Sequence, residues 1–233
     1  AAMAARGAAI GTAWAGSLTM GVGQFCTNPG IAVVIDGAEA DAFVAAASEA
    51  LSATTPQVML TTGIAEAYRN GVKTIGAQNA VREVLGTMCD NRDAAPYLYE
   101  VSAADWLANA ALRHEVFGPM GMVVRARDLA QMREIALSLE GQLTCTLHMD
   151  DSDLAEARAL LPILERKAGR VLANGFPTGV EVCDAMVHGG PYPASTNFGA
   201  TSVGSLAIRR FLRPVCYQNM PAGLLPSELA ELG

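Results

Sequence analysis

The chain has 233 residues, which is enough for one domain with a buried core and does not require two. Its formal charge of −7, without a basic cluster, argues against a nucleic-acid surface, and no apolar run reaches the length of about eighteen residues that a membrane span needs. We therefore expect a soluble protein with no nucleic-acid and no membrane partner, whose core is aliphatic because only 6% of the residues are aromatic.

The cysteines point to a reducing compartment. There are five, an odd number, they are widely spaced at positions 26, 89, 145, 183 and 216, and none forms a Cys-x-x-Cys pair. This pattern argues against a disulfide framework and against a structural zinc site. The first residues also lack the charged stretch and apolar core of a secretory signal. We expect a cytoplasmic protein without a metal site.

The first half of the chain predicts helices alternating with extended segments. Ile10, Trp14 and Leu18 recur at helical spacing in an alanine-rich stretch, and a β-branched run follows later between turn residues. The predicted elements are a helix over 1–18, a strand over 31–35, a helix over 38–53, a helix over 64–75 interrupted by Gly71, a helix over 77–85 and an extended segment over 95–101.

Residues 120–174 predict three strands separated by two helices. Asp128 can cap the first of these helices with Gln131 completing a capping box, and Ser152 or Asp151 can cap the second. The strands are expected over 122–124, 142–149 and 171–173. Right-handed crossovers then give a parallel sheet. The predicted fold class is α/β, with a mostly parallel sheet covered by helices.

After Asn174 the sequence becomes irregular and rich in glycine and proline, as functional loops often are. A last strand is predicted over 208–218. Pro214 lies inside it and cannot donate a ladder hydrogen bond, so we expect this strand at a sheet edge.

Cys26 is the candidate nucleophile. It lies in the run Gly-Val-Gly-Gln-Phe-Cys-Thr-Asn-Pro-Gly at 21–30, where two glycines permit a tight bend before the thiol and Asn28-Pro29-Gly30 forms a turn after it. A ligand can approach a thiol on such a loop closely. The preceding helix C-terminus disfavours a thiolate, so activation must come from elsewhere.

Two motifs carry a family resemblance. Gly-Gln-x-Cys-Thr-x-Pro at 23–29 and Glu115-Val116-Phe117-Gly118-Pro119, about ninety residues downstream, resemble the paired motifs of the NAD(P)-dependent aldehyde dehydrogenases. The resemblance runs from residue 1 to about 219. The segments 187–196 and 211–219 are similar to the branch of this family that acts on 2-oxoglutarate semialdehyde (2,5-dioxopentanoate).

The resemblance implies a chemistry and its residues. A Cys26 thiolate would add to an aldehyde to give a thiohemiacetal, and hydride transfer to NAD or NADP would leave a thioester for water to hydrolyse. Glu115 would accept hydrogen bonds from the ribose next to the nicotinamide, and Phe117 would lie near the nicotinamide ring. Phe25 and Thr27 beside the nucleophile are candidate walls of the aldehyde pocket.

Three candidates come from the region after the last helix of the 120–174 unit. Phe176 and His188, in the irregular loop, are candidate substrate-lining residues. Asn174 matches an asparagine that the family keeps near its reactive cysteine, although a turn residue at a strand end is an equally good interpretation. For His188 the ordinary alternative is a loop histidine without a role.

The resemblance also bears on domain organisation. A family subunit is roughly twice this length, and its cofactor-binding half, with the general-base glutamate, precedes the cysteine. We therefore expect a C-terminal fragment that is inactive alone. Residues 1–205 would form the catalytic domain, and 206–233 an oligomerisation strand and tail that pairs subunits into a homodimer or homotetramer.

Two other functions stay open. The chain could be a non-catalytic assembly module, or a cofactor-free thiol acyltransferase or esterase built around Cys26. The latter needs a histidine within reach of the thiol, and the only histidines are at positions 114, 148 and 188.

Overall fold

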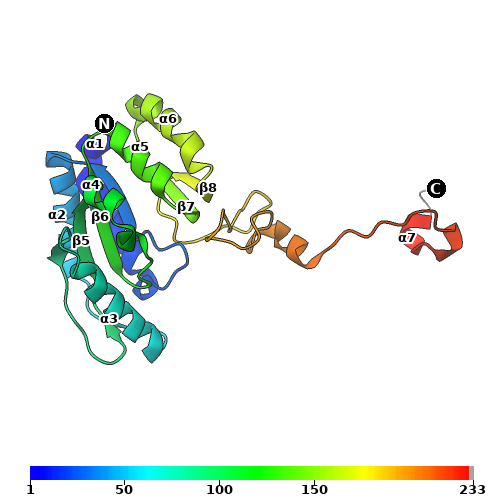
Figure 1. Ribbon diagram of the computed structural model, residues 1–233, viewed down its shortest axis with the longest axis horizontal. Coiled ribbons are helices and arrows are strands. Elements are labelled where there is room, and N and C mark those ends of the chain that lie inside the picture. Colours follow the sequence, from blue (N-terminus) through cyan, green and yellow to red (C-terminus); the bar gives the residue numbers. More distant parts are fainter. Residues whose placement is uncertain (231–233) are drawn as a thin grey trace.

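The fold is described from a computed structural model, for residues 1–230. A four-stranded sheet has the order β1(Ile31–Ile35), β6(Met120–Ala126), β5(Tyr97–Ser102), β3(Arg82–Leu85). β1, β6 and β5 are parallel, and β3 is antiparallel to β5. Helices cover both faces of this sheet (Figure 1). The α/β class predicted from the sequence is confirmed.

The two faces of the sheet carry separate cores, because successive strand residues point to opposite sides. Leu98 and Val123 pack with α1(Ala2–Thr19) and α2(Ala38–Ser52), and Trp14 of α1 is only 2% exposed there. Tyr99 and Met122 face the other way, against α3(Thr62–Gly76), α4(Ala103–Ala108) and α5(Leu129–Ser138). These two layers hold the loops that follow the strands in place.

A second, two-stranded parallel sheet joins β7(Gln142–Leu147) to β8(Ala168–Ala173). α6(Leu154–Leu164) covers it and packs against α5 through Ala136, Leu160 and Leu164. The strands and helices predicted for 120–174 are confirmed, but they do not form one sheet. β6 is paired with β1 on one edge and β5 on the other, so it has no edge left for β7.

Several local predictions need correction. Residues 82–85 form strand β3 and not a helix, because their backbone pairs with β5. Gly71 does not interrupt α3; it lies inside the helix, where a Cβ atom would come within 2.7 Å of the Val116 side chain. Asp128 caps α5 as predicted, accepting from the Gln131 amide at 2.8 Å. The turn before α6 is closed by Asp150 and Asp153 in a capping box, and not by Ser152 or Asp151.

The remaining elements are short. They are η1(Met20–Gly23), β2(Gln57–Val58), β4(Asp93–Ala94), η2(Ala110–Arg113), η3(Asp151–Asp153), η4(Ser205–Phe211), η5(Ala222–Leu224) and α7(Ser227–Ala230). β2 pairs with β4 in a second small sheet. Across the residues that the structure describes, no helix is both long and apolar enough to cross a bilayer.

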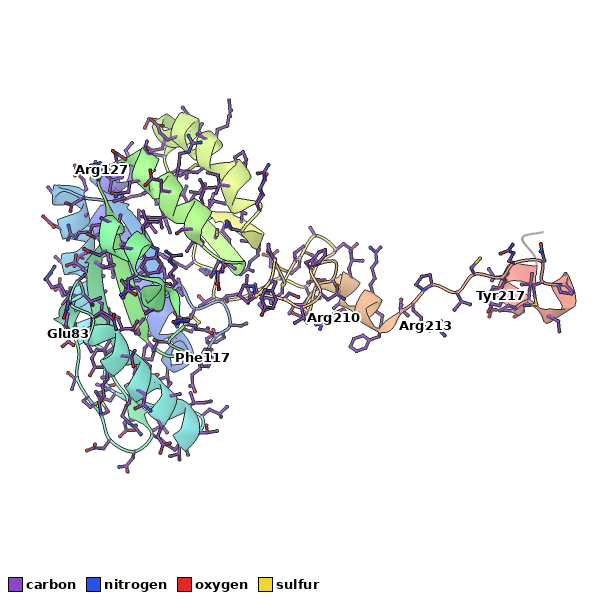
Figure 2. All side chains as sticks on the ribbon, in the orientation of Figure 1. Glu83, Phe117, Arg127, Arg210, Arg213 and Tyr217 are labelled. Carbon is purple, nitrogen blue, oxygen red and sulfur yellow. The ribbon has the colours of Figure 1, made fainter. Side chains whose placement is uncertain are left out.

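η4 and the segment after it extend away from the folded body (Figure 1); Arg210 of η4 and then Arg213 and Tyr217 lie along this part of the chain, at a distance from the sheets (Figure 2). The final strand predicted over 208–218 is wrong for the single chain: 208–211 belong to a 3-10 helix, and 212–218 have no regular structure. Strand geometry needs a partner strand, and no strand within residues 1–230 pairs with this segment. Residues 231–233 of the predicted tail lie outside the described residues.

Candidate active site

The turn before Cys26 is left-handed over three successive residues. Gly21, Val22 and Gly23 have φ values of 56°, 60° and 65°. This conformation suits glycine but costs a β-branched residue such as Val22 about 1–3 kcal/mol. Val22 tolerates it because its side chain is buried in the core with only 7% exposed. The turn therefore fixes the path of the chain from α1 to the thiol.

Asn28 joins the two sequence motifs. Its Nδ2 donates to the carbonyl of Gly23 at 2.9 Å and to that of Leu18 at 3.0 Å, and it lies 3.5 Å from the carbonyl of Gly118. Gly23 packs so tightly against Gly118 that a Cβ atom at position 23 would overlap with that backbone. The loop of Cys26 and the loop of Glu115–Pro119 are thus in direct contact, although about ninety residues separate them.

Glu115 and Phe117 are both exposed on the second of these loops, with 37% of Phe117 accessible. Figure 2 shows Phe117 on the side of the body from which the C-terminal segment departs. A free carboxylate can accept two hydroxyl hydrogen bonds. An accessible ring on the same loop can form the wall of a ligand site; that Glu115 and Phe117 bind the cofactor stays a prediction.

Cys26 is exposed, and its Sγ lies 3.2 Å from Nε2 of His188. Burial, and secondly the positive charge of Arg170, lower the pKa of His188 below its ordinary value. The imidazole is consequently neutral at pH 7 and can accept a proton from the thiol when Nε2 is the unprotonated nitrogen. Among the three histidines, His188 is the one that the structure brings to Cys26.

The backbone on either side of the His188 ring is anchored. The amide of His188 donates to Thr201 Oγ1 at 2.8 Å, and its carbonyl accepts from the amide and hydroxyl of Ser202 at 3.0 and 2.9 Å. The next two residues lie directly on the β7–β8 sheet: a Cβ atom at Gly190 would overlap with the carbonyl of Gln142. The irregular loop is therefore ordered where it carries His188.

Arg170 of β8 holds the segment that covers the Cys26 loop. Its guanidinium donates to the carbonyls of Pro177 at 2.6 Å and Gly179 at 3.0 Å. The buried hydroxyl of Thr27 donates to the same Pro177 carbonyl at 3.1 Å. Sequence reasoning did not select Arg170 or Thr201, because an arginine in a strand and a threonine in a loop carry no motif.

The other candidates lie in different surroundings. Phe25 is 38% exposed and its ring folds back over Gly21. Phe176 packs against His148, with ring centroids 4.8 Å apart, and both border a hollow of about 190 Å³ beside α1. That Phe25, Thr27 and Phe176 line the aldehyde pocket stays a prediction.

Asn174 borders the same hollow and not the thiol. Its Oδ1 accepts from Arg6 at 2.7 Å and from the Met149 amide at 2.9 Å, and its Nδ2 donates to the Met149 carbonyl at 2.8 Å. Its φ of 55° is one that asparagine tolerates. The interpretation of Asn174 as a turn residue at a strand end accounts for all these contacts.

Comparison with known proteins gives a close relative over the whole chain. The alpha-ketoglutaric semialdehyde dehydrogenase 2 of Azospirillum brasilense is 56% identical over 233 residues, a match that takes in 99% of this chain and 44% of that protein. The chain thus spans less than half the length of this curated relative. A scan against family models found no match.

Solved structures share the fold at lower identity. A salicylaldehyde dehydrogenase from Pseudomonas putida G7 matches with a TM-score of 0.68 and 21% identity, over 91% of this chain and 44% of that one. The glyceraldehyde-3-phosphate dehydrogenase GapN from Methanocaldococcus jannaschii, complexed with NADP, matches with a TM-score of 0.62 and 21% identity, over 76% and 37%.

The fold is that of part of the solved aldehyde dehydrogenases. In sequence the chain is similar to the alpha-ketoglutaric semialdehyde dehydrogenases, which confirms the resemblance to this branch indicated by the sequence.

Proposed function

We propose that the protein containing this chain oxidises 2-oxoglutarate semialdehyde to the acid, with Cys26 as nucleophile and NAD or NADP as hydride acceptor. The observation that supports this proposal is the contact of Gly23 with Gly118, which joins the loop that carries the exposed Cys26 to the loop that carries the exposed Glu115 and Phe117. The semialdehyde is proposed because the relative from Azospirillum is named for it.

The chain's own residues perform the covalent steps. Cys26 Sγ forms a bond to the aldehyde carbon, and the carbonyl electrons move to oxygen, where the backbone N–H of Cys26 can donate to the developing oxyanion. Removal of one such donor typically costs a hundredfold or more in rate. When bound, a nicotinamide dinucleotide accepts the hydride. The resulting thioester at Cys26 is then open to water.

Glu115 and Phe117 would hold the nicotinamide end of that dinucleotide. Their exposure on the loop next to Cys26 fits this role. NADP is bound in the structural neighbour GapN, so a nicotinamide cofactor suits the fold. Nothing in the chain's own residues selects between NAD and NADP.

The test of the nucleophile compares Cys26→Ala with Cys89→Ala in the longest natural form of the protein that contains these residues. Cys26→Ala should abolish NAD(P)-dependent oxidation of the semialdehyde while cofactor binding, followed by fluorescence quenching, persists. Cys89→Ala should leave turnover unchanged, because Cys89 lies outside both motif loops. Retained turnover in Cys26→Ala rejects the proposal.

We also propose that 206–233 joins subunits into a homodimer or homotetramer, with 1–205 as the catalytic domain, in the cytoplasm. The segment displays exposed apolar side chains, including Phe211 at 83% and Leu212 at 65%, which a partner subunit would cover. Light scattering tests this: deletion of the residues after 205 should give a monomer. A monomer before deletion contradicts both this proposal and the alternative that the chain is an assembly module.

A second candidate function gains support from the 3.2 Å contact of Cys26 with His188. A thiol with a histidine in reach can perform cofactor-free acyl transfer. Stoichiometric acylation of Cys26 by an activated ester, without any nicotinamide, would support it. Absence of acylation in a protein that oxidises aldehydes would reject it.

A further inference from the structure

The thiol of Cys26 needs a proton acceptor that the preceding helix does not provide. α1 ends at Thr19, and the partial negative charge of a helix C-terminus disfavours a nearby thiolate. Nε2 of His188, 3.2 Å from Sγ, is within hydrogen-bond reach of the thiol proton. This contact joins residues 162 positions apart, so the fold and not local sequence creates it.

From this pair we propose that His188 is a catalytic acid–base residue of the semialdehyde oxidation, acting on the Cys26 thiol and on the water that releases the product. The inference deepens the function proposed above and rests on it. Two steps involve His188, and the hydride transfer between them does not require it.

In the first step, His188 Nε2 takes the proton from Sγ while sulfur forms a bond to the aldehyde carbon. The carbonyl electrons move to oxygen, and the backbone N–H of Cys26 donates to the resulting thiohemiacetal oxyanion. These electrons re-form the carbonyl when the hydride leaves, and the imidazolium releases its proton to solvent before the last step. In the last step, neutral His188 takes a proton from water as the water oxygen bonds to the thioester carbon. The carbon–sulfur bond then breaks, and the proton passes to the departing sulfur, so that Cys26 and His188 return to their starting forms.

Hydrogen bonds on both sides hold the backbone that carries the imidazole of His188. Thr201 Oγ1 and Ser202 hold the amide and carbonyl of His188, and Thr201 is itself only 8% exposed. Gly190 lets the loop lie on the backbone of β7. These bonds fix the backbone at residue 188 and so limit where the imidazole can lie.

The charged groups near the His188 ring favour its neutral form, which can act as a base. The charged or titratable groups whose influence reaches His188 and its partner are Arg170 of β8 and Cys26 of the motif loop. Arg170 resists protonation of the neighbouring imidazole and would stabilise a thiolate at Cys26. A neutral imidazole beside a thiol that can ionise is the state that the first step requires.

The experiment measures the alkylation rate of Cys26 by iodoacetamide between pH 5 and pH 10, without cofactor, by peptide mass spectrometry. In the wild-type protein we expect a reactive plateau near neutral pH. In His188→Gln the rate at pH 7 should fall about tenfold or more and rise only with ordinary thiol ionisation. His114→Gln, at an exposed histidine that has no hydrogen bond to Cys26, is the matched control and should follow the wild-type profile.

A second variant separates chemistry from folding. In His188→Gly, added imidazole should restore Cys26 alkylation at pH 7, whereas a purely structural role would leave it unrestored. Superimposable profiles for wild type and His188→Gln overturn the inference, even if Cys26 proves essential for oxidation. If His188→Gln slows alkylation but Cys26→Ala still oxidises the semialdehyde, the proposed function fails and the pairing stands.

Discussion

His188 and His148 lie in similar surroundings but have different partners. Both are partly buried, and burial first and a nearby arginine second lower the pKa of each: Arg170 for His188 and Arg6 for His148. His188 reaches the Cys26 thiol. Both ring nitrogens of His148 are buried and have no hydrogen-bond partner among the described residues. Burial and charge alone therefore do not identify a reactive histidine; the atom within hydrogen-bond reach does.

The polar groups that border the hollow beside His148 form hydrogen bonds with one another and stabilise the fold. Arg6 donates to Asp150, to the Met149 carbonyl and to Asn174, so the guanidinium has several partners within the chain. Phe176 covers one face of the His148 ring. By contrast, the Cys26 site presents an exposed thiol.

The largest expected effect is on catalysis. His188→Gln should lower kcat/KM for the semialdehyde about a hundredfold, the usual contribution of a general acid–base residue, while His148→Gln should change it less than about twofold. Steady-state kinetics of both variants with the same cofactor measure this. Equal losses in the two variants would show that the histidines are not functionally distinct.

A smaller effect is expected from the arginine beside each histidine. Arg170→Gln should raise the pKa of His188 toward its ordinary value, because the second cause of its lowering is removed. The acid limb of the Cys26 alkylation profile should then move to higher pH, and the rate at pH 6 should fall about threefold.

Arg170→Lys keeps the charge and is the matched control for that shift, although a lysine cannot reproduce the two hydrogen bonds to Pro177 and Gly179. Arg6→Gln should not move the profile, since Arg6 affects His148. If Arg6→Gln shifts the pH profile of Cys26 alkylation and Arg170→Gln does not, the assignment of Arg170 to His188 and of Arg6 to His148 is contradicted.

Much of this contrast could not be predicted from the sequence. The Cys26 and Glu115 motifs identify the family, and the helical spacing of Trp14 and Leu18 predicts α1, because these signals are local. His188 was only one of two weak candidates in an irregular loop. Its contact with Cys26 depends on how the glycines at 189 and 190 pack that loop against β7 and β8. A pattern of residue spacing in the sequence does not predict such packing.

The errors in the fold have the same origin. Within the helix predicted over 77–85, residues 82–85 instead form β3 because they pair with β5, so tertiary pairing outweighed local propensity. The strand predicted over 208–218 has no such partner among the described residues. A strand cannot be predicted reliably from local sequence because it forms only where another strand pairs with it.

The smallest effect concerns stability at the His148 site. Burial lowers the pKa of His148 in the folded chain, so below about pH 6.5 the unfolded chain takes up a proton that the folded chain resists. The free energy of unfolding should therefore fall as the pH drops from 7 to 5.

His148→Phe tests this contribution because it keeps the aromatic contact with Phe176 and removes two unpartnered nitrogens. We expect the variant to be more stable by about 1 kcal/mol at pH 7, which is the low end of the cost of a buried unpaired polar group. Its advantage should be larger at pH 5, where the wild-type protein also opposes protonation. Guanidinium unfolding midpoints of both proteins at the two pH values measure it. An advantage that does not grow at pH 5 would mean that the His148 ring gains access to water, and the physical contrast with His188 would then rest on the thiol contact alone.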